Sequence, residues 1–296
     1  MNTEADRELQ EPSKTELKPH TLYLVGVPIG NLGDFTPRAA DILRRADYIA
    51  CEEVQASRRL LNALHLEVKG TLISYRESGR EASGSNIADL LKQGKTVAVI
   101  SGAGMPGISD PGRDLVLKCH QEGLGVSPVP GASALTAAAA SCGLPTRRFA
   151  FEGFLPRGDG DRQKFLATLA REERTMLFFE APHRVLSTLQ ALREAFGNRR
   201  AFVGRELTKY FEECVLADLE FFCEKYRETE PRGEFVIAVE GLQEDETAKA
   251  LEAKVQLEAD CEFLKDLDIS AKDKAAILGY FRDIPKNKAK QAVMGK

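Results

Sequence analysis

The sequence has few of the residues that usually bind metals. It contains only four histidines in 296 residues, and its six cysteines form no CxxC pair. Structural and catalytic metal sites need several such ligands close together, so we expect no metal. The cysteines lie mostly in apolar stretches, which favours buried thiols in a reducing cytoplasm. They are Cys51, Cys119, Cys142, Cys214, Cys223 and Cys261.

Long apolar runs and an excess of positive charge are also missing. No apolar stretch approaches the length of a membrane-spanning helix. Residues 1–20 are polar, without the apolar core of a signal peptide, and predict a disordered tail. The net charge of −4 excludes a globally basic nucleic-acid-binding protein, but not a local basic patch. A hydrophobic content of 43% supports two folded domains, and we expect a soluble, cytoplasmic protein.

The first half of the chain alternates between short apolar segments and amphipathic ones. Such alternation predicts an α/β domain with a parallel or mostly parallel sheet, here over residues 21–131. The predicted strands are 22–27, 47–51, 72–74, 96–101 and 125–129. The predicted helices between them are 35–45, 57–66, 82–93 and 112–122.

The second half predicts another α/β domain, over residues 132–242, followed by a helical appendage over 243–296. Strands at 149–154, 175–179, 201–205, 213–217 and 234–239 lie closer together, which favours a mixed or antiparallel sheet. A polar loop is expected at 155–162, and helices at 248–267 and 270–282, the second with a capping box formed by Ser270 and Asp273. Residues 285–296 hold four lysines and no acid, which indicates a basic tail. The appendage either contacts RNA or is a solvated extension.

Glycine-rich loops follow three of the predicted strands. Residues 101–112 contain four glycines and two prolines, in a spacing that matches neither a Walker loop nor a dinucleotide fingerprint. Residues 28–34 and 130–133 follow two other strands. Converging strand ends are where α/β proteins bind ligands. The three loops predict a site for a cofactor with a purine, a ribose and an amino-acid carboxylate, the alternative being turns without a ligand.

Charged residues follow the strands of the second domain. Glu180 ends a strand, and His183 and Arg184 begin the next helix, where a cation is unfavourable unless an anion or a cleft partner is near. Glu206 and Lys209 follow a later strand and are able to share a proton with a nearby hydroxyl. For each segment, the alternative is that these charged residues lie on the surface in contact with solvent and have no role in a binding site.

These segments, taken in order, resemble the bacterial small-subunit ribosomal RNA methyltransferase I family of the tetrapyrrole methylase superfamily. The matching segments are 28–32, 101–112, 153–157, 178–184, 205–209 and 232–236. The resemblance spans residues 20–296. It implies a two-domain tetrapyrrole-methylase-like α/β fold with a small C-terminal helical appendage, S-adenosylmethionine between the domains, and a homodimer.

The same resemblance implies 2′-O-methylation of a cytidine ribose in 16S rRNA of the 30S subunit, without a metal. One alternative is a divergent homologue that binds the cofactor or rRNA and transfers no methyl group. Another is a methyltransferase for a tetrapyrrole or other small molecule. The divergent alternative is motivated by lost polar side chains: Gly102 replaces an aspartate of the family, Val54 and Gln55 replace a Thr-Arg pair, and Ser78 lies in an altered His-Glu-His-Asn motif.

Residue roles follow from the resemblance. Glu53 or Glu206 is the candidate base, and Lys209, Arg184 and Arg205 are candidates for holding phosphate or stabilising the developing alkoxide. Arg157 is expected to contact phosphate. The nucleotide side of the cleft would also include Glu180 and His183. Residues expected around the cofactor are Pro28, Ser101, Ala103, Gly104, Pro106, Ile108, Gly131, Ser133, Phe179 and Gly233.

Overall fold

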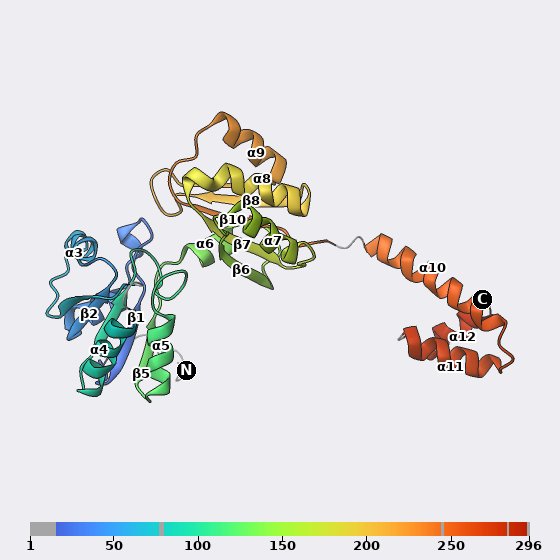
Figure 1. Cartoon of the computed structure of the whole chain (residues 1–296), viewed down its shortest axis with the longest axis horizontal. Coiled ribbons are helices and arrows are strands. Elements are labelled where there is room, and N and C mark those ends of the chain that lie inside the picture. The colour runs from blue at the N-terminus through green and yellow to red at the C-terminus, as the bar shows by residue number, and fades with distance from the viewer. Residues whose placement is uncertain (1–15, 77–79, 244–245, 283, 295–296) are drawn as a thin grey trace, which may run out of the picture. The chain divides into compact units, whose positions relative to one another are not determined.

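A computed structural model of the chain describes residues 16–76, 80–243, 246–282 and 284–294 (Figure 1). It divides into two compact units, Met1–Gly241 and Leu242–Lys296. The first unit contains two five-stranded sheets, and the second contains helices. No helix of the described segments is long and apolar enough to cross a bilayer.

The first sheet is wholly parallel, as predicted, with strand order β3-β2-β4-β1-β5. Every residue of its central strand β4 is buried, which is typical of a sheet covered on both faces. Its strands are β1 (Thr21–Val25), β2 (Tyr48–Cys51), β3 (Thr71–Ser74), β4 (Val97–Ile100) and β5 (Gly125–Val129). Helices α2 (Pro37–Arg45) and α3 (Val54–Ala63) pack on one face, and α4 (Arg80–Lys92) and α5 (Arg113–Gln121) on the other.

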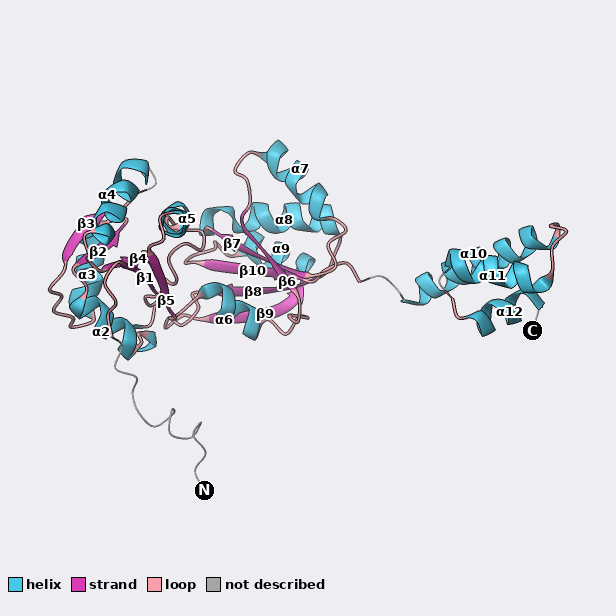
Figure 2. Cartoon of the chain, turned by 90° about the horizontal axis from the view of Figure 1, so that it is seen from below, coloured by secondary structure: helices cyan, strands magenta, loops and turns pink. Residues whose placement is uncertain are grey.

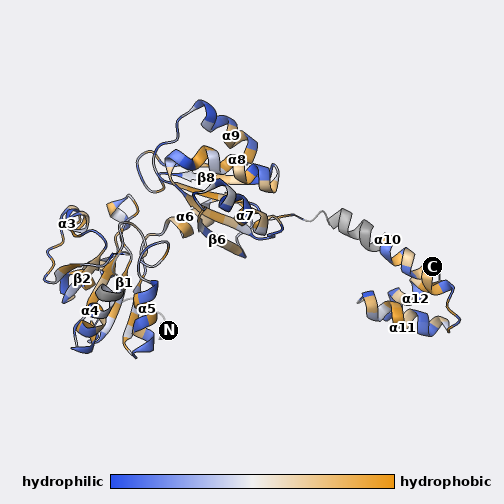
Figure 3. Ribbon diagram, in the orientation of Figure 1, coloured by the Kyte–Doolittle hydropathy of each residue, from blue (hydrophilic) through white to orange (hydrophobic). Residues whose placement is uncertain are grey.

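The second sheet is mixed, which confirms the expectation from its closer strand spacing. Its order is β6-β7-β10-β8-β9, and only β6 and β7 are parallel. The strands are β6 (Phe149–Phe154), β7 (Thr175–Glu180), β8 (Arg200–Arg205), β9 (Glu213–Asp218) and β10 (Phe235–Val239). One face carries α7 (Asp159–Leu169), α8 (Val185–Phe196) and α9 (Leu219–Glu228), and the other carries α6 (Ala134–Ser141). Hydrophobic residues concentrate in these strands (Figure 3).

The predicted loop 155–162 is shorter than expected, because α7 begins inside it at Asp159. Asp159 and Asp161 lie in the first turn of α7, where acidic side chains are favourable. The 3-10 helices η1 (Leu32–Asp34) and η2 (Pro182–Arg184) follow β1 and β7. Of the predicted N-terminal tail, residues 1–15 lie outside the described residues. Its last residues pack on the domain instead, since the ring Nδ1 of His20 lies 2.8 Å from the carbonyl oxygen of Leu91.

The C-terminal unit consists of α10 (Glu246–Lys265), α11 (Ala271–Arg282) and α12 (Lys286–Met294) (Figure 2). Ser270 and Asp273 form the predicted capping box: the Asp273 backbone N–H donates to Ser270 Oγ at 3.2 Å. The expected basic tail is instead the helix α12, which packs Ala289 into a small core with Leu264, Ala275 and Leu278. This helix was not predicted from the sequence, because its apolar residues Ala289, Ala292 and Val293 lie among lysines and other polar residues.

Candidate functional site

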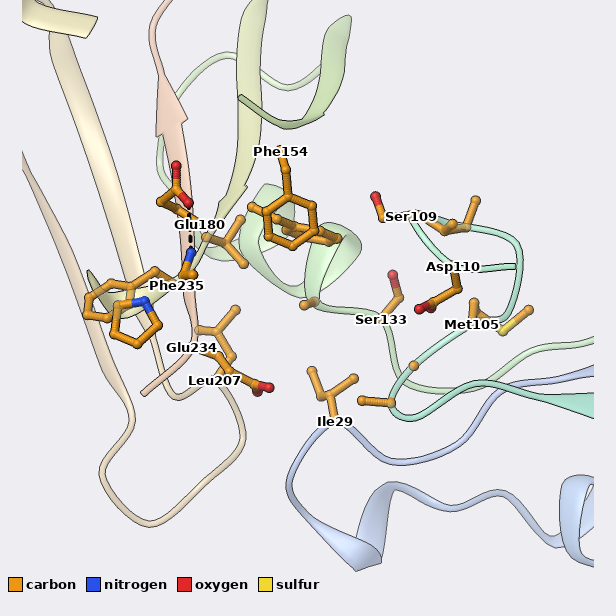
Figure 4. Close-up of a pocket in the computed structure, with 18 residues that line it drawn as sticks. Ile29, Met105, Ser109, Asp110, Ser133, Phe154, Glu180, Leu207, Glu234 and Phe235 are labelled. Carbon is orange, nitrogen blue, oxygen red and sulfur yellow. Dashed lines mark hydrogen bonds between the residues drawn. The ribbon is translucent and has the colours of Figure 1, made fainter. Parts of the chain in front are cut away.

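A pocket of about 460 Å³ lies in the first unit, lined by residues from both sheets' loops and strand ends (Figure 4). Ile29 follows β1, and Gly104, Ile108 and Asp110 follow β4. Phe179 comes from β7 on the opposite wall. The carboxyl ends of β1 and β4 meet at one edge of the sheet because the two strands are parallel.

The pocket floor is made of main chain held by short hydrogen bonds. Val27 and Gly104 exchange two backbone bonds, of 2.9 and 3.1 Å. The hydroxyl of Ser101 donates to the carbonyl oxygens of Ala103 and Gly104, at 3.0 and 3.2 Å. Gly104 has φ +72°, a conformation that favours glycine. The loop after β4 is therefore tied to the loop after β1 without a bulky side chain between them.

Aromatic rings form part of the opposite wall. Phe179 contacts Phe151 and Phe154 edge to face, with ring centroids 4.8 and 5.7 Å apart. Phe154 lines the pocket and is 53% exposed. An exposed ring in a pocket is available for contact with a flat apolar ligand group.

Asp110 is the one carboxylate that the glycine loop after β4 places in the pocket. It has no hydrogen-bond or ion-pair partner in the described segments. Burial, with a smaller effect from the charge of Glu52, raises the pKa of Asp110 to about 6. A half-buried, unpartnered carboxylate is suited to binding a cationic ligand, whose charge would offset the desolvation of the anion.

Glu180 and Arg184 lie together at the end of β7. The fully buried Glu180 carboxylate accepts hydrogen bonds from Thr188 Oγ1 at 2.6 Å and from the Ala181 backbone N–H at 2.8 Å. Arg184 Nε lies 3.4 Å from Glu180, and its guanidinium donates to the carbonyl oxygens of Leu155 and Pro156 at 2.8 and 3.2 Å. The sequence analysis expected a partner for the cation at the start of this helix. For Arg184 that partner is Glu180.

Lys209 joins two carboxylates beside the pocket. Its Nζ lies 2.8 Å from both Glu206 and Glu234, and Glu234 lines the pocket. The hydrogen bond from Lys209 lowers the pKa of Glu206. The Lys209 side chain crosses Gly30, where a Cβ would come within 2.3 Å of it. This close approach brings the loop after β1 to the turn after β8.

The comparisons with known proteins agree with this architecture. The family model for tetrapyrrole (corrin/porphyrin) methylases matches residues 21–221. A Synechocystis protein named ribosomal RNA small subunit methyltransferase I is 44% identical over 221 residues, which are 74% of this chain and 78% of that protein. A Thermotoga maritima protein of the same name is 43% identical over 222 residues, 75% of this chain and 99% of the relative. This chain belongs to the ribosomal RNA small subunit methyltransferase I family.

Solved structures confirm the tetrapyrrole-methylase fold that the sequence implied. Cobalt precorrin-4 methyltransferase has a TM-score of 0.57 at 19% identity, over 75% of this chain and 95% of that one. Uroporphyrin-III C-methyl transferase from Thermus thermophilus, complexed with S-adenyl homocysteine, has a TM-score of 0.52 at 20% identity, over 74% of this chain and 97% of that one.

Half of the residues assigned to the cofactor line this pocket, and the other half do not. Ala103, Gly104, Ile108, Ser133 and Phe179 line it. Those that do not line it are Pro28, Ser101, Pro106, Gly131 and Gly233. Among these, Ser101 holds the loop after β4, and Gly131 packs against Gly26. The position of a Cβ on Gly233 is filled by the side chain of Glu206, 2.5 Å away. The cofactor roles of all ten stay predictions.

The residues assigned to catalysis and to RNA are dispersed. Arg205 pairs with Glu213 at 3.0 Å and lines a different pocket, of about 340 Å³. His183 and Arg157 are exposed. Glu53 lines a third pocket, of about 510 Å³. Their assigned roles likewise stay predictions.

The positions where this chain departs from the family motifs gather around the pocket of Glu53. Gly102 and Arg76 line it, and Val54 and Gln55 begin α3 beside it. Ser78 lies outside the described residues. These departures lie in one region of the first domain, and none of these residues lines the pocket with Phe179 and Asp110. A further departure, Gly26-Val27 in place of the Pro-Thr of the family, lies beside that pocket, where Val27 exchanges backbone hydrogen bonds with Gly104. Among the described residues, no group of three or more His, Cys, Asp or Glu side chains is placed to hold a metal ion.

Asp110 and Phe154 are among the pocket-lining residues to which the sequence analysis assigned no role. Both lie inside motifs singled out from the sequence, within residues 101–112 and 153–157. The signal for Asp110 was its position between Ser109 and Pro111, in a loop otherwise almost free of charge.

Removing the guanidinium of Arg184 is expected to destabilise the fold. Arg184→Gln would leave the carbonyl oxygens of Leu155 and Pro156 without their donor, and the buried Glu180 without its cation. We expect a loss of about 1 to 3 kcal/mol in the free energy of unfolding, measured by urea denaturation. Arg193→Gln, at an exposed ion pair with Glu220, is the control and should change stability by less than about 1 kcal/mol. Equal losses in the two variants would contradict this account of Arg184.

Proposed function

We propose that this protein transfers the methyl group of S-adenosylmethionine to the 2′-oxygen of a cytidine ribose in 16S rRNA. The observation that carries the proposal is a pocket of main chain, aromatic rings and one unpartnered carboxylate, in a chain 44% identical to a ribosomal RNA small subunit methyltransferase I. The fold family contains an enzyme solved with S-adenyl homocysteine.

The residues present fit S-adenosylmethionine by their chemistry. Adenine needs apolar surfaces, which Ile29, Phe154 and Phe179 offer. A cationic amino-acid portion needs an anion, and Asp110 is the unpartnered carboxylate of the pocket. Gly104 allows a ligand to approach the main chain closely.

The chain's own residues would align the ribose hydroxyl and receive its proton. When bound, the cofactor supplies a methyl group on a positively charged sulfur, so the reaction needs a positioned oxygen and a proton acceptor. Glu206 and Glu53 both remain candidates for the acceptor. Glu206 would become an effective base once Lys209 moves away from it, since the ion pair lowers its pKa. Lys209 would then be free to pair with an RNA phosphate.

We also propose that the protein acts as a homodimer on the 30S subunit in the cytoplasm, without a metal ion. Phosphate contacts from the exposed Arg157 and His183 would fix the position of the RNA. Arg184 and Arg205 would join them by exchanging Glu180 and Glu213 for phosphate. Static light scattering on the purified chain tests the oligomeric state. Activity that survives exhaustive chelation would support a metal-free reaction.

Loss of one ribose methylation is the expected result of deleting the gene. Mass spectrometry of small-subunit RNA from the deletion strain should show a cytidine that lacks its 2′-O-methyl group, and the intact gene should restore it. Purified protein should transfer labelled methyl from S-adenosylmethionine to 30S subunits of the deletion strain. Cofactor or RNA binding without transfer would favour the divergent alternative. Transfer to a tetrapyrrole but not to 30S subunits would favour a small-molecule methyltransferase.

A further inference from the structure

The C-terminal unit has a cluster of lysines without partners on α12. Lys286, Lys288 and Lys290 are exposed and have no ion-pair partner among the described residues. Two other cations of the same unit are engaged: Arg282 pairs with Asp260, and Lys265 pairs with Glu262. Lys286 and Lys290 lie one helical turn apart on one flank of α12, and Lys288 lies on the other flank. The helix is therefore locally basic in a chain of net charge −4.

Two aromatic side chains at the end of α11 are also exposed. Tyr280 is 85% exposed and Phe281 77%, and their rings meet edge to face with centroids 5.7 Å apart. Smaller residues such as Ala275 and Leu278 fill the core of the unit instead. Only residues 283–285 separate the two aromatic residues' helix from α12, so the rings and the lysines belong to one helix–turn–helix segment. Exposed rings and unpaired cations on two consecutive helices are the combination of groups that binds single-stranded nucleic acid.

A relative of the same family is too short to contain this unit. The Thermotoga maritima protein is matched over 99% of its length by 222 residues of this chain. A match of that length has room for the two α/β domains but not for the helical unit as well. The unit is therefore an addition to a complete enzyme, which favours a role in substrate binding over a role in catalysis.

We propose that α11 and α12 bind a single-stranded segment of the substrate RNA, with Lys286, Lys288 and Lys290 on phosphates and Tyr280 and Phe281 stacked on bases. The inference rests on the proposed function and deepens it by assigning a second RNA contact outside the methyl-transfer pocket. Stacking on an aromatic ring tolerates any base, and lysine–phosphate contacts carry no sequence information. The unit would therefore raise affinity for RNA without selecting the nucleotide.

The lysine contribution is tested by salt-dependent binding of the full chain. The probe is a labelled single-stranded RNA of about 16 nucleotides, followed by fluorescence anisotropy. The triple variant Lys286→Gln, Lys288→Gln, Lys290→Gln should bind at least about tenfold more weakly. Its slope of log affinity against log salt should be shallower by about 2, for three lost phosphate contacts. The matched control is Lys92→Gln, Lys95→Gln, Lys118→Gln, which removes three lysines already paired with carboxylates. The control should retain the affinity and slope of the unmodified chain.

The aromatic contribution has a different signature. Tyr280→Ala with Phe281→Ala should weaken RNA binding by about fivefold or more while leaving the salt slope unchanged. Tyr280→Phe, which keeps the ring, should bind as tightly as the unmodified chain.

Three outcomes would overturn the inference. They are RNA affinity unchanged in the lysine variant, an equal loss in its control, and a changed molar mass of either variant in light scattering, which would mark the surface as a contact between copies. All variants should bind S-adenosylmethionine as the unmodified chain does in calorimetry. Failure of the unmodified chain to methylate 30S subunits would refute the proposed function instead, and RNA binding is measured independently of it.

Discussion

Asp110→Asn should weaken S-adenosylmethionine binding by about 10- to 100-fold and at the same time stabilise the free protein. The carboxylate lines the pocket, and no residue of the described segments pairs with it. A bound cation would therefore compensate its charge. An interaction with a charged group contributes about 1.5 to 3 kcal/mol, which corresponds to that range of affinity. Isothermal titration calorimetry measures the loss, with Asp41→Asn on the surface of α2 as the control.

The stability gain follows from the direction of the pKa shift. Burial raises the pKa of Asp110 to about 6, above its unfolded value of 3.8. Between these two pH values the folded state binds more protons than the unfolded state, so stability falls as the pH rises through this window. At pH 7 the charged Asp110 therefore destabilises the free protein. Asparagine removes that cost, and we expect a gain of about 1 kcal/mol after allowing for partial solvation.

The cofactor affinity should depend on pH in the opposite direction. Below about pH 6 the carboxyl of Asp110 is protonated and no longer attracts a cation. Affinity of the unmodified chain should fall as the pH is lowered through that value, while the affinity of Asp110→Asn should not change there. A variant that binds as tightly as the unmodified chain, or is less stable at pH 7, would contradict this role of Asp110.

The sequence predicted the parts of the fold that depend on local pattern. Central strands such as β4 are continuous apolar runs because the sheet is covered on both faces. Strands β5 and β6 begin and end at the residues that the sequence predicted. The capping box of Ser270 and Asp273 is likewise a local signal. The sequence analysis did not predict α12 as a helix, because half of its four apolar residues are alanine and it contains three lysines, which gives little hydrophobic contrast.

The site was harder to predict, because its electrostatics depend on contacts between distant segments. Arg184 was expected near an anion or a cleft partner, and the structure shows that Glu180 is its ion-pair partner and that it also holds the loop after β6. Lys209 is engaged by Glu234, 25 residues further on. Asp110 was overlooked because its perturbation arises from burial and from Glu52, neither of which a motif reveals. Sequence spacing identified the segments that meet, but not the partners within them.

Gly131→Ala is expected to slow methyl transfer by about 100-fold, although Gly131 does not line the pocket. A Cβ at this position would lie within 2.9 Å of the backbone carbon and oxygen atoms of Gly26. Backbone atoms cannot rotate away as a side chain can, so the loops after β1 and β5 must separate. Ser133, two residues further, lines the pocket and would move with its loop. A displacement of about 1 Å in a catalytic site can reduce turnover by about 100-fold.

The matched control for this variant is Gly160→Ala, the same change at a site with open space. A Cβ at Gly160, within α7, meets no atom within 4 Å, and alanine there should raise stability by up to about 1 kcal/mol. Gly131→Ala should lower the free energy of unfolding by about 1 to 3 kcal/mol. Circular dichroism at low temperature establishes that it is folded before its turnover and its cofactor affinity are measured. If the folded variant methylates 30S subunits at the normal rate, the close approach of the two loops is not what shapes the pocket. If turnover falls while the fold persists, the packing of Gly26 against Gly131 holds the main-chain floor on which the methyl donor rests.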